Sequence, residues 1–239
     1  MSQHITHQWE PHPNQRSCGC VFQRCGICGV IRRTYRCTLH TNQAFAYDED
    51  AYYTRPEMGN FAGMIASQDI QCRELERASQ FIGPLWRAGA AVLDVGAGIG
   101  RLAPYVLATD AHYHACEIHP WAVRFMRSVY WRAITVLDAP FEELDRGTEW
   151  DAVLCVHTLE HFAESHRQFE RMTEMIGDSG VIVTCTPNQA DIWNPDHHWA
   201  FAPRTLQVWA AACGLRAVLM WMTEPMARGE RYIWTSIRR

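Results

Sequence analysis

The stretch AVLDVGAGIGR, residues 91–101, constrains the fold of this chain more than any other segment. A short apolar run around Asp94 leads directly into Gly96, Gly98 and Gly100, and a helical pattern follows in GRLAPYVLATD. Glycines between a strand and a helix let the chain turn tightly and bring backbone amides close to a ligand that a Cβ would hold away. We therefore expect this loop to hold a ligand.

From about residue 60 onward, apolar runs alternate with helical stretches. The pattern predicts helices within 58–83, 100–110, 119–131, 161–177 and 203–214, the last one ending at Gly214, and strands at 91–95, 113–118, 134–139, 151–156, 180–187, 216–222 and 231–237. Such alternation is typical of an α/β fold, a doubly wound and mostly parallel seven-stranded sheet with helices on both faces. In this architecture ligands bind at the carboxyl ends of the strands.

The type of ligand is indicated by what surrounds the glycine loop. A dinucleotide-binding loop would read G-x-G-x-x-G, whereas this loop reads G-A-G-I-G, which disfavours NAD. The second predicted strand ends at Glu117, where a carboxylate can accept hydrogen bonds from both hydroxyls of a ribose. The loop and the acid together predict a nucleoside cofactor.

The motifs LDVGAGIGR, ACEIHP, VLDAPFEEL and DAVLCVHTLEHF resemble those of class I S-adenosylmethionine-dependent methyltransferases, over roughly residues 60–239. The ubiquinone-type O-methyltransferases are the subgroup that fits best, and HHWAFAPRTLQVWAAACGL is similar to their late segment. The resemblance implies a methyltransferase that uses S-adenosylmethionine, with Asp94 near the methionine part, Glu117 on the ribose and Asp138 near the adenine. The cofactor-binding residues that it implies are Asp94, Gly96, Ala97, Gly98, Gly100, Glu117, Ile118, Asp138, Ala139 and His157.

The resemblance also implies that residues 157–161 face the reacting methyl group. His161 and His198 are the candidate general bases, because an imidazole with a pKa near 6.5 can take a proton from a hydroxyl at neutral pH. Glu160 would orient the ring, cap the following helix, or bind a divalent ion with His157 and His161. Ubiquinone-type enzymes often carry an acidic residue, a type of metal ligand, at the position of His157. Because this chain has a histidine there, the sequence does not predict whether a catalytic divalent metal is used.

The string HTLEH also satisfies H-x-x-E-H, the inverted zinc-peptidase motif. That motif requires both histidines on one face of a continuous helix. Here His157 follows directly on the apolar strand, so a metallopeptidase is the least favoured alternative.

Residues 1–50 differ from the expected methyltransferase domain, residues 51–239. Five of the ten cysteines lie between Cys18 and Cys37, and no helical or strand period there is long enough to bury a core. In CGICG, glycines free the amides to point at the sulfurs of Cys25 and Cys28, in the manner of a zinc knuckle. We expect a structural zinc ion on Cys18, Cys20, Cys25 and Cys28, with Cys37 or His40 as alternative ligands; reduced thiols in a flexible leader are the other interpretation. The segment resembles zinc modules of certain sugar C-methyltransferases.

The net charge of the chain indicates which kinds of partner it can bind. A formal charge of −4 over 239 residues argues against a chain-wide basic surface for polynucleotides. We expect the methyl acceptor to be a small molecule or a nucleotide sugar with a hydroxyl group. One alternative is an acceptor in RNA or DNA that the zinc module and its arginines recognise. The other is a non-catalytic protein that only binds the cofactor. The polar N-terminus lacks a signal-peptide profile and no apolar run is long enough for a membrane span, so a cytoplasmic protein without membrane partners is expected. The oligomeric state is not predicted.

Overall fold

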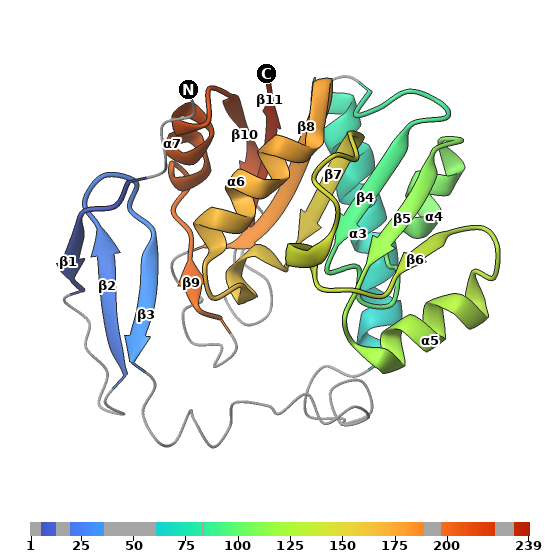
Figure 1. Ribbon diagram of the computed structural model, residues 1–239, viewed down its shortest axis with the longest axis horizontal. Coiled ribbons are helices and arrows are strands. Elements are labelled where there is room, and N and C mark those ends of the chain that lie inside the picture. The colour runs from blue at the N-terminus through green and yellow to red at the C-terminus, as the bar shows by residue number, and fades with distance from the viewer. Residues whose placement is uncertain (1–5, 13–19, 36–60, 83, 189–196, 223–231) are drawn as a thin grey trace. The chain divides into compact units, whose positions relative to one another are not determined.

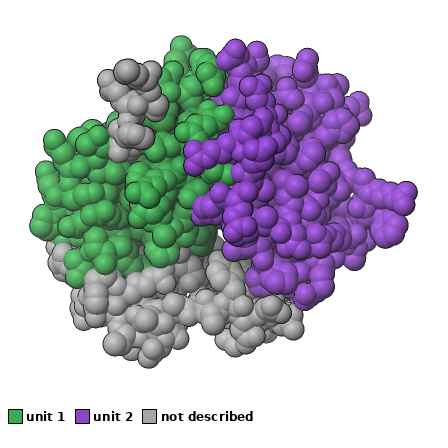
Figure 2. All heavy atoms as spheres, viewed as in Figure 1, with its two compact units in different colours: residues 1–45, 157–174, 183–239 green, residues 46–156, 175–182 purple. Residues whose placement is uncertain are grey.

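The computed structural model describes residues 6–12, 20–35, 61–82, 84–188, 197–222 and 232–239 (Figure 1). Its contacts divide the chain into two compact units, coloured separately in Figure 2. Unit 1 contains residues 1–45, 157–174 and 183–239, and unit 2 contains residues 46–156 and 175–182.

A seven-stranded sheet has the strand order β10-β11-β8-β7-β4-β5-β6 (Figure 1). Its strands are β4 (Ala91–Val95), β5 (His112–Cys116), β6 (Thr135–Leu137), β7 (Trp150–Val156), β8 (Ile176–Pro187), β10 (Arg216–Met222) and β11 (Tyr232–Arg238). β4 is parallel to β5 and β7, β5 is parallel to β6, and β10 is antiparallel to β11. The predicted doubly wound, mostly parallel sheet is confirmed, and each predicted strand overlaps an observed one.

In unit 2, β4 lies between β5 and β7 and is apolar on both faces. Val92, Leu93 and Val95 are completely buried, as expected for a central parallel strand covered on both sides. The helices of this part of the chain are α3 (Phe61–Ile82), α4 (Ala103–Ala108) and α5 (Pro120–Val129), with the 3-10 turn η2 (Phe141–Glu143). α4 packs against α3 and β5, and α5 packs against β6. This packing fixes the loop after β4 and the end of β5.

Unit 1 contains a second, antiparallel sheet of four strands, in the order β1-β2-β3-β9 (Figure 1). Its strands are β1 (Trp9–Pro11), β2 (Val21–Cys25), β3 (Ile31–Tyr35) and β9 (Trp199–Ala200). Phe22 and Ile31 are buried in one apolar cluster with Cys20 and Ala200. The cysteine-rich residues therefore have strands and a small core that the sequence analysis did not predict, and one edge of that sheet comes from residues 199–200.

The helical elements of unit 1 include η3 (Leu159–His161), α6 (Ser165–Met175) and α7 (Thr205–Ala212). α6 begins in this unit and ends at its boundary with unit 2. α7 packs against β10 and is followed by Gly214, whose φ of 73° is the left-handed stop that the sequence predicted. Its Trp209 is fully buried and makes edge contacts with the rings of Phe169 and Phe201. Among the helices that the structure describes, none combines the length and the apolar character that crossing a membrane requires.

Candidate functional site

The loop after β4 turns around glycines whose backbone is left-handed, with φ values of 69°, 58° and 75° at Gly96, Gly98 and Gly100. At Gly100 packing also requires glycine, since a Cβ would lie 3.0 Å from Cε2 of Tyr130 and 3.2 Å from Sδ of Met126. The carbonyl of Gly100 accepts a hydrogen bond from the Tyr130 hydroxyl at 3.0 Å. The loop is therefore held by α5 and the residue after it.

Backbone donors at the start of this loop bind the end of β5. The N–H groups of Gly96 and Ala97 donate to the carbonyl of Cys116 at 2.9 and 3.1 Å, and Gly98 N–H donates to Oε2 of Glu117 at 2.7 Å. The sequence predicts that amides of this loop approach a ligand, but these three donate to the chain itself. Their role in the structure is to fix the loop to β5.

Glu117 is a buried carboxylate at the carboxyl end of β5, 8% exposed. Besides Gly98, it accepts hydrogen bonds from the N–H groups of Ile118 and His119 to Oε1, both at 2.8 Å. Burial raises the pKa of Glu117, and these backbone donors counteract part of that rise. The result is an oriented acceptor with three backbone donors, at the strand end where the sequence analysis expects a ribose.

Asp94 is buried within β4 and accepts a hydrogen bond from the hydroxyl of Tyr113 on β5. Burial raises the pKa of Asp94 to about 7, although the Tyr113 hydrogen bond and the Arg101 charge lower it. Tyr113 is completely buried beside it, and sequence reasoning missed this partner. β4 and β5 are consecutive predicted strands, so assuming that they pair would have indicated Tyr113 as a neighbour of Asp94.

Three other residues expected to bind the cofactor are Asp138, Ala139 and Ile118, and two of them are accessible. Asp138 follows β6 and pairs with Arg127 at 3.2 Å, with 48% of its side chain exposed. Ile118 is an apolar side chain that is 55% exposed. The carbonyl of Ala139 accepts a hydrogen bond from the Cys116 thiol at 3.4 Å. An exposed isoleucine next to a buried carboxylate suits a ligand with an apolar ring and a polar sugar.

In unit 1, Glu160 is a buried carboxylate among histidines. Its Oε1 lies 3.8 Å from Nδ1 of His157 and 3.9 Å from Nε2 of His197, which are ion-pair distances rather than hydrogen bonds. The ring of His161 meets that of His197 edge to face, with centroids 4.7 Å apart. Burial by itself would raise the pKa of Glu160, but attraction to His157, His161 and His197 outweighs it, so this pKa is lowered. Glu160 is therefore an ionised group beside imidazoles.

The string HTLEH does not form one helix. His157 has a left-handed φ of 56°, its N–H donates to the carbonyl of Cys185 at 2.9 Å, and only residues 159–161 form a 3-10 turn. The two histidines of the motif thus do not share the face of a continuous helix, which excludes the helical geometry of the inverted zinc-peptidase motif. His157 instead lies edge-on to the ring of Tyr232, with centroids 4.4 Å apart.

Of two successive histidines, the structure brings the first into the Glu160 cluster. His197 is 8% exposed and joins Glu160 and His161. The N–H of His198 donates to the carbonyl of Glu160 at 2.8 Å, and its carbonyl accepts a hydrogen bond from the N–H of Arg33 at 2.9 Å. His198 stays a predicted base, and His197 is a neighbour of Glu160 that the sequence pattern did not single out. The doubled histidine was the signal, but it does not indicate which ring points inward.

Near the N-terminus, His7, Cys25 and Cys28 place one ligand atom each within 4.8 Å of one another. Burial lowers the pKa of His7 to about 4, with a further contribution from the charges of His166 and Arg32, so this imidazole is neutral at pH 7. Of the other expected zinc ligands, Cys20 lies in the apolar cluster of the hairpin, and Cys18, like the alternatives Cys37 and His40, falls outside the described residues. The sequence did not single out His7, because the histidines of this polar stretch, at positions 4, 7 and 12, follow no ligand spacing.

Comparison with known proteins gives the family. The chain matches the model of a family described as "Methyltransferase domain" over residues 67–219, more than half of its length. Over 132 residues it is 26% identical to the ubiquinone biosynthesis O-methyltransferase of Nitrobacter winogradskyi and 28% identical to that of Bradyrhizobium diazoefficiens. These matches cover 51% of this chain and 47% and 49% of the two relatives. The chain thus spans about half the length of the curated relatives it matches.

Solved structures share the fold at low sequence identity. The 1,6-didemethyltoxoflavin-N1-methyltransferase of Burkholderia thailandensis, with bound 1,6-didemethyltoxoflavin and S-adenosylhomocysteine, has a TM-score of 0.62 at 17% identity, covering 96% of this chain and 99% of that one. The magnesium protoporphyrin IX methyltransferase of Synechocystis, with bound SAM, has a TM-score of 0.57 at 15% identity, covering 80% of this chain and 95% of that one. The family match over residues 67–219 shows that the chain belongs to the methyltransferase-domain family, and these structures show that it shares the fold of S-adenosylmethionine-dependent methyltransferases.

Proposed function

We propose that the protein transfers the methyl group of S-adenosylmethionine to a hydroxyl group of a small molecule or a nucleotide-linked sugar. The observation that carries the cofactor part is the carboxylate of Glu117, held by Gly98 N–H at 2.7 Å at the carboxyl ends of β4 and β5. Parallel α/β sheets bind ligands at this edge. The formal charge of −4 supports a small acceptor over a polynucleotide.

The residues around the glycine loop fit the cofactor chemically. Glu117 would accept a hydrogen bond from the ribose, the exposed side chain of Ile118 would cover a face of the adenine, and Asp138 would accept from its amino group. Asp94 and the loop Gly96–Gly100 would enclose the methionine part. When bound, S-adenosylmethionine supplies an electrophilic methyl group on a sulfonium sulfur. The protein contributes mainly placement and exclusion of water, which together can lower a barrier by several kcal/mol.

His161 is our proposed general base. Its half-buried ring contacts His197, and the ionised, fully buried Glu160 beside it can stabilise the imidazolium that forms when the ring takes a proton. Glu160 would then be a positioning residue, as the carboxylate is in other acid–base pairs. His198 stays the alternative base.

Replacing the base tests this assignment. His161→Ala should lower kcat by at least about 100-fold with nearly unchanged affinity for S-adenosylhomocysteine, because a general base contributes typically 10²- to 10⁴-fold. The same result for His198→Ala, with His161→Ala unaffected, would move the role to His198. The control is His112→Ala, an exposed histidine of unit 2. If both variants keep wild-type turnover, neither histidine is the base.

A second candidate role of the Glu160 cluster is the binding of a divalent cation. Glu160, His161 and His197 offer ligand atoms within 4.8 Å of one another, and neither carboxylate oxygen of Glu160 has a hydrogen-bond partner among the described residues. Carboxylate and imidazole together suit zinc or another first-row cation. Loss of turnover on dialysis against a chelator, and its recovery with added metal in wild-type protein but not in Glu160→Gln, would favour this role.

Methyl transfer itself is tested with S-adenosylmethionine labelled in its methyl group, incubated with separated small-molecule and nucleic-acid extracts. Label in hydroxyl-bearing small molecules, absent with Glu117→Ala, is the expected result. Label in RNA or DNA would favour the nucleic-acid alternative. Cofactor binding without transfer into any fraction would favour the non-catalytic module.

The cysteine-rich residues before position 51 have a separate proposed role. We propose that they bind one structural zinc ion, because two buried cysteines and a histidine converge there. Thiolates can supply the stability that so small a core lacks.

A further inference from the structure

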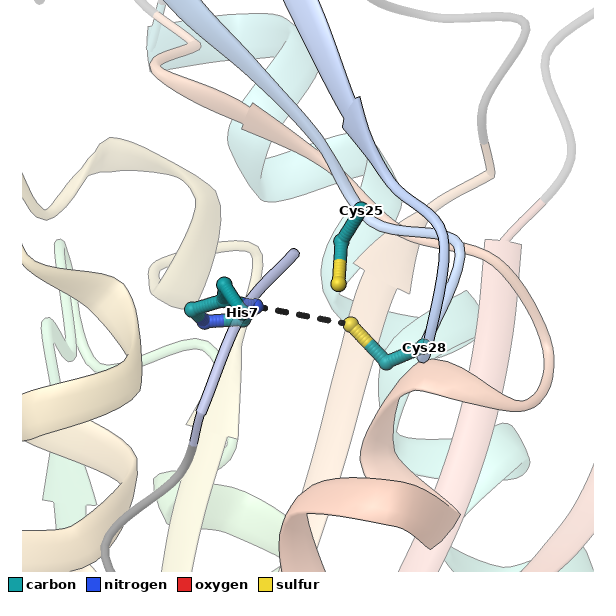
Figure 3. A group of neighbouring side chains, drawn as sticks. All are labelled: His7, Cys25 and Cys28. Carbon is teal, nitrogen blue, oxygen red and sulfur yellow. Dashed lines mark hydrogen bonds between the residues drawn. The ribbon is translucent and has the colours of Figure 1, made fainter. Parts of the chain in front are cut away.

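Three side chains of metal-ligand type converge beside the four-stranded sheet of unit 1 (Figure 3). His7 precedes β1, Cys25 ends β2, and Cys28 lies in the turn that leads to β3. Cys25 and Cys28 are free cysteines with exposures of 0% and 1%. In Figure 3 the imidazole of His7 faces the sulfur of Cys28, and the sulfur of Cys25 lies beside them. A residue before β1, the last residue of β2 and a residue of the following turn thus place one donor atom each near a common point.

The distances between these donors suit a tetrahedral zinc ion. Nδ1 of His7 and Sγ of Cys28 are 3.7 Å apart. Bond lengths of about 2.3 Å for Zn–S and about 2.0–2.1 Å for Zn–N at a tetrahedral angle place the two donors about 3.6 Å apart. A thiol–imidazole hydrogen bond would explain this one distance. It would not explain why the second buried sulfur, that of Cys25, lies in the same group.

Backbone N–H groups point at both sulfurs. Those of Gln8, Ile27 and Cys28 approach the sulfur of Cys25, and that of Val30 approaches the sulfur of Cys28. Such donors can orient a sulfur as the outer shell of a metal site does. A small core residue has no need for several donors aimed at one thiol.

We infer that His7, Cys25 and Cys28 are ligands of one zinc ion, and that His7 takes a place that the cysteine pattern gave to Cys20. Cys20 is 2% exposed and packs with Phe22, Ile31 and Ala200, as a small apolar residue does. The site does not depend on methyl transfer, so it stands or fails separately from the proposed activity.

The ligand-bearing turn also holds the start of α7. The hydroxyl of Thr205 donates to the carbonyl of Cys28 at 3.1 Å, and the guanidinium of Arg204 donates to that of Gly26 at 3.3 Å. The ion would therefore tie the segment before β1 to the hairpin and, through this turn, to α7. Its removal should loosen the beginning of α7 along with the N-terminal residues.

The test is elemental analysis of the full chain prepared without chelator and reconstituted with equimolar zinc. We expect about one zinc per chain, and at least about 100-fold weaker zinc affinity in His7→Ala and Cys28→Ser, measured by competition with a chromophoric chelator. The matched control is Cys20→Ala, an equally buried cysteine of the same hairpin, which should keep the metal. Glu160→Gln should keep the ion at His7, Cys25 and Cys28, because Glu160 belongs to the other cluster; a second ion bound at that cluster would be lost in this variant alone. Loss of zinc in Cys20→Ala with retention in His7→Ala would overturn the inference.

X-ray absorption at the zinc edge of the wild-type protein gives an answer even if the variants fail to fold. The expected first shell contains two or three sulfurs near about 2.3 Å and at least one nitrogen near about 2.0 Å. A first coordination shell of four sulfurs would exclude His7 as a zinc ligand. A shell without sulfur, or no zinc after reconstitution, would exclude the whole site.

Discussion

Glu117→Gln is the substitution that most directly tests the cofactor site. A carboxylate offers about four lone-pair sites for hydrogen bonds. Three are used by the N–H groups of Gly98, Ile118 and His119 at 2.7, 2.8 and 2.8 Å, which leaves one for a ribose hydroxyl. A glutamine keeps a single oxygen, so its amide nitrogen must face at least one backbone donor.

The expected losses follow from that count. One hydrogen bond to a charged group contributes about 1.5–3 kcal/mol, so losing the ribose bond should raise the Kd of S-adenosylhomocysteine about 10- to 150-fold. At least one charged backbone bond is lost as well, and the free energy of unfolding should fall by a similar amount of about 1.5–3 kcal/mol. Titration calorimetry and urea denaturation measure the two effects. Glu143→Gln, an exposed glutamate of η2, is the control and should change neither.

A second ligand separates the ribose contact from the loop. With an analogue of S-adenosylhomocysteine that lacks both ribose hydroxyls, wild type and Glu117→Gln should differ far less in Kd than they do with the natural ligand. If the substitution raised the Kd of both ligands by the same factor, Glu117 would act only by holding the loop. Unchanged affinity for the natural ligand would refute the assignment of Glu117 altogether.

Two further predictions concern unit 2. Gly89 and Gly100 share a φ of 75°, but a Cβ at Gly89 meets nothing within 4 Å, whereas one at Gly100 approaches Tyr130 and Met126. Gly89→Ala should thus cost only the left-handed strain of about 1–2 kcal/mol, and Gly100→Ala about 1–3 kcal/mol more; equal urea midpoints would contradict this packing. For Asp94, the folded-state pKa of about 7 exceeds the ordinary 3.8, so its contribution to stability is complete below pH 4 and is lost as the pH rises through 7. Without cofactor, the unfolding free energy of wild type relative to Asp94→Asn should fall by up to about 4 kcal/mol over that window, and a pH-independent difference would show that Asp94 is ionised when folded.

The sequence predicted the large sheet well, because its strands and helices are encoded locally. The apolar run of β4, the glycines after it and the stop at Gly214 each depend on a few neighbouring residues. Glu117 was found in the same way, as the acid that follows the second strand. What it binds in the structure, the N–H of Gly98, depends on the pairing of β4 with β5. The residue could be predicted, but not its present partners.

The N-terminal sheet and the clusters of unit 1 could not be predicted in this way. β1, β2 and β3 contain three to five residues each, too few for a period to stand out, and they are mixed with charged residues. The ring of His197 rather than that of His198 joins Glu160, and adjacent residues of an irregular segment give no signal for direction. His7 meets Cys28 across 21 positions. Local sequence patterns carry no information about contacts between residues so far apart in the chain.

The pairing of β3 with β9 has a consequence for how the chain is made. Ile31 pairs with Ala200, so β3 leaves the ribosome long before its neighbour exists. At synthesis rates of about 5–20 residues per second, the hairpin would wait roughly 10–30 s with an open edge and without Ala200, one of the four residues of its apolar cluster. An unpaired strand edge is a template for pairing with other chains. The zinc ion proposed for this hairpin would stabilise it during the wait, although its edge stays open until β9 is made. Zinc supply during expression should therefore affect the yield of soluble protein more than zinc added afterwards.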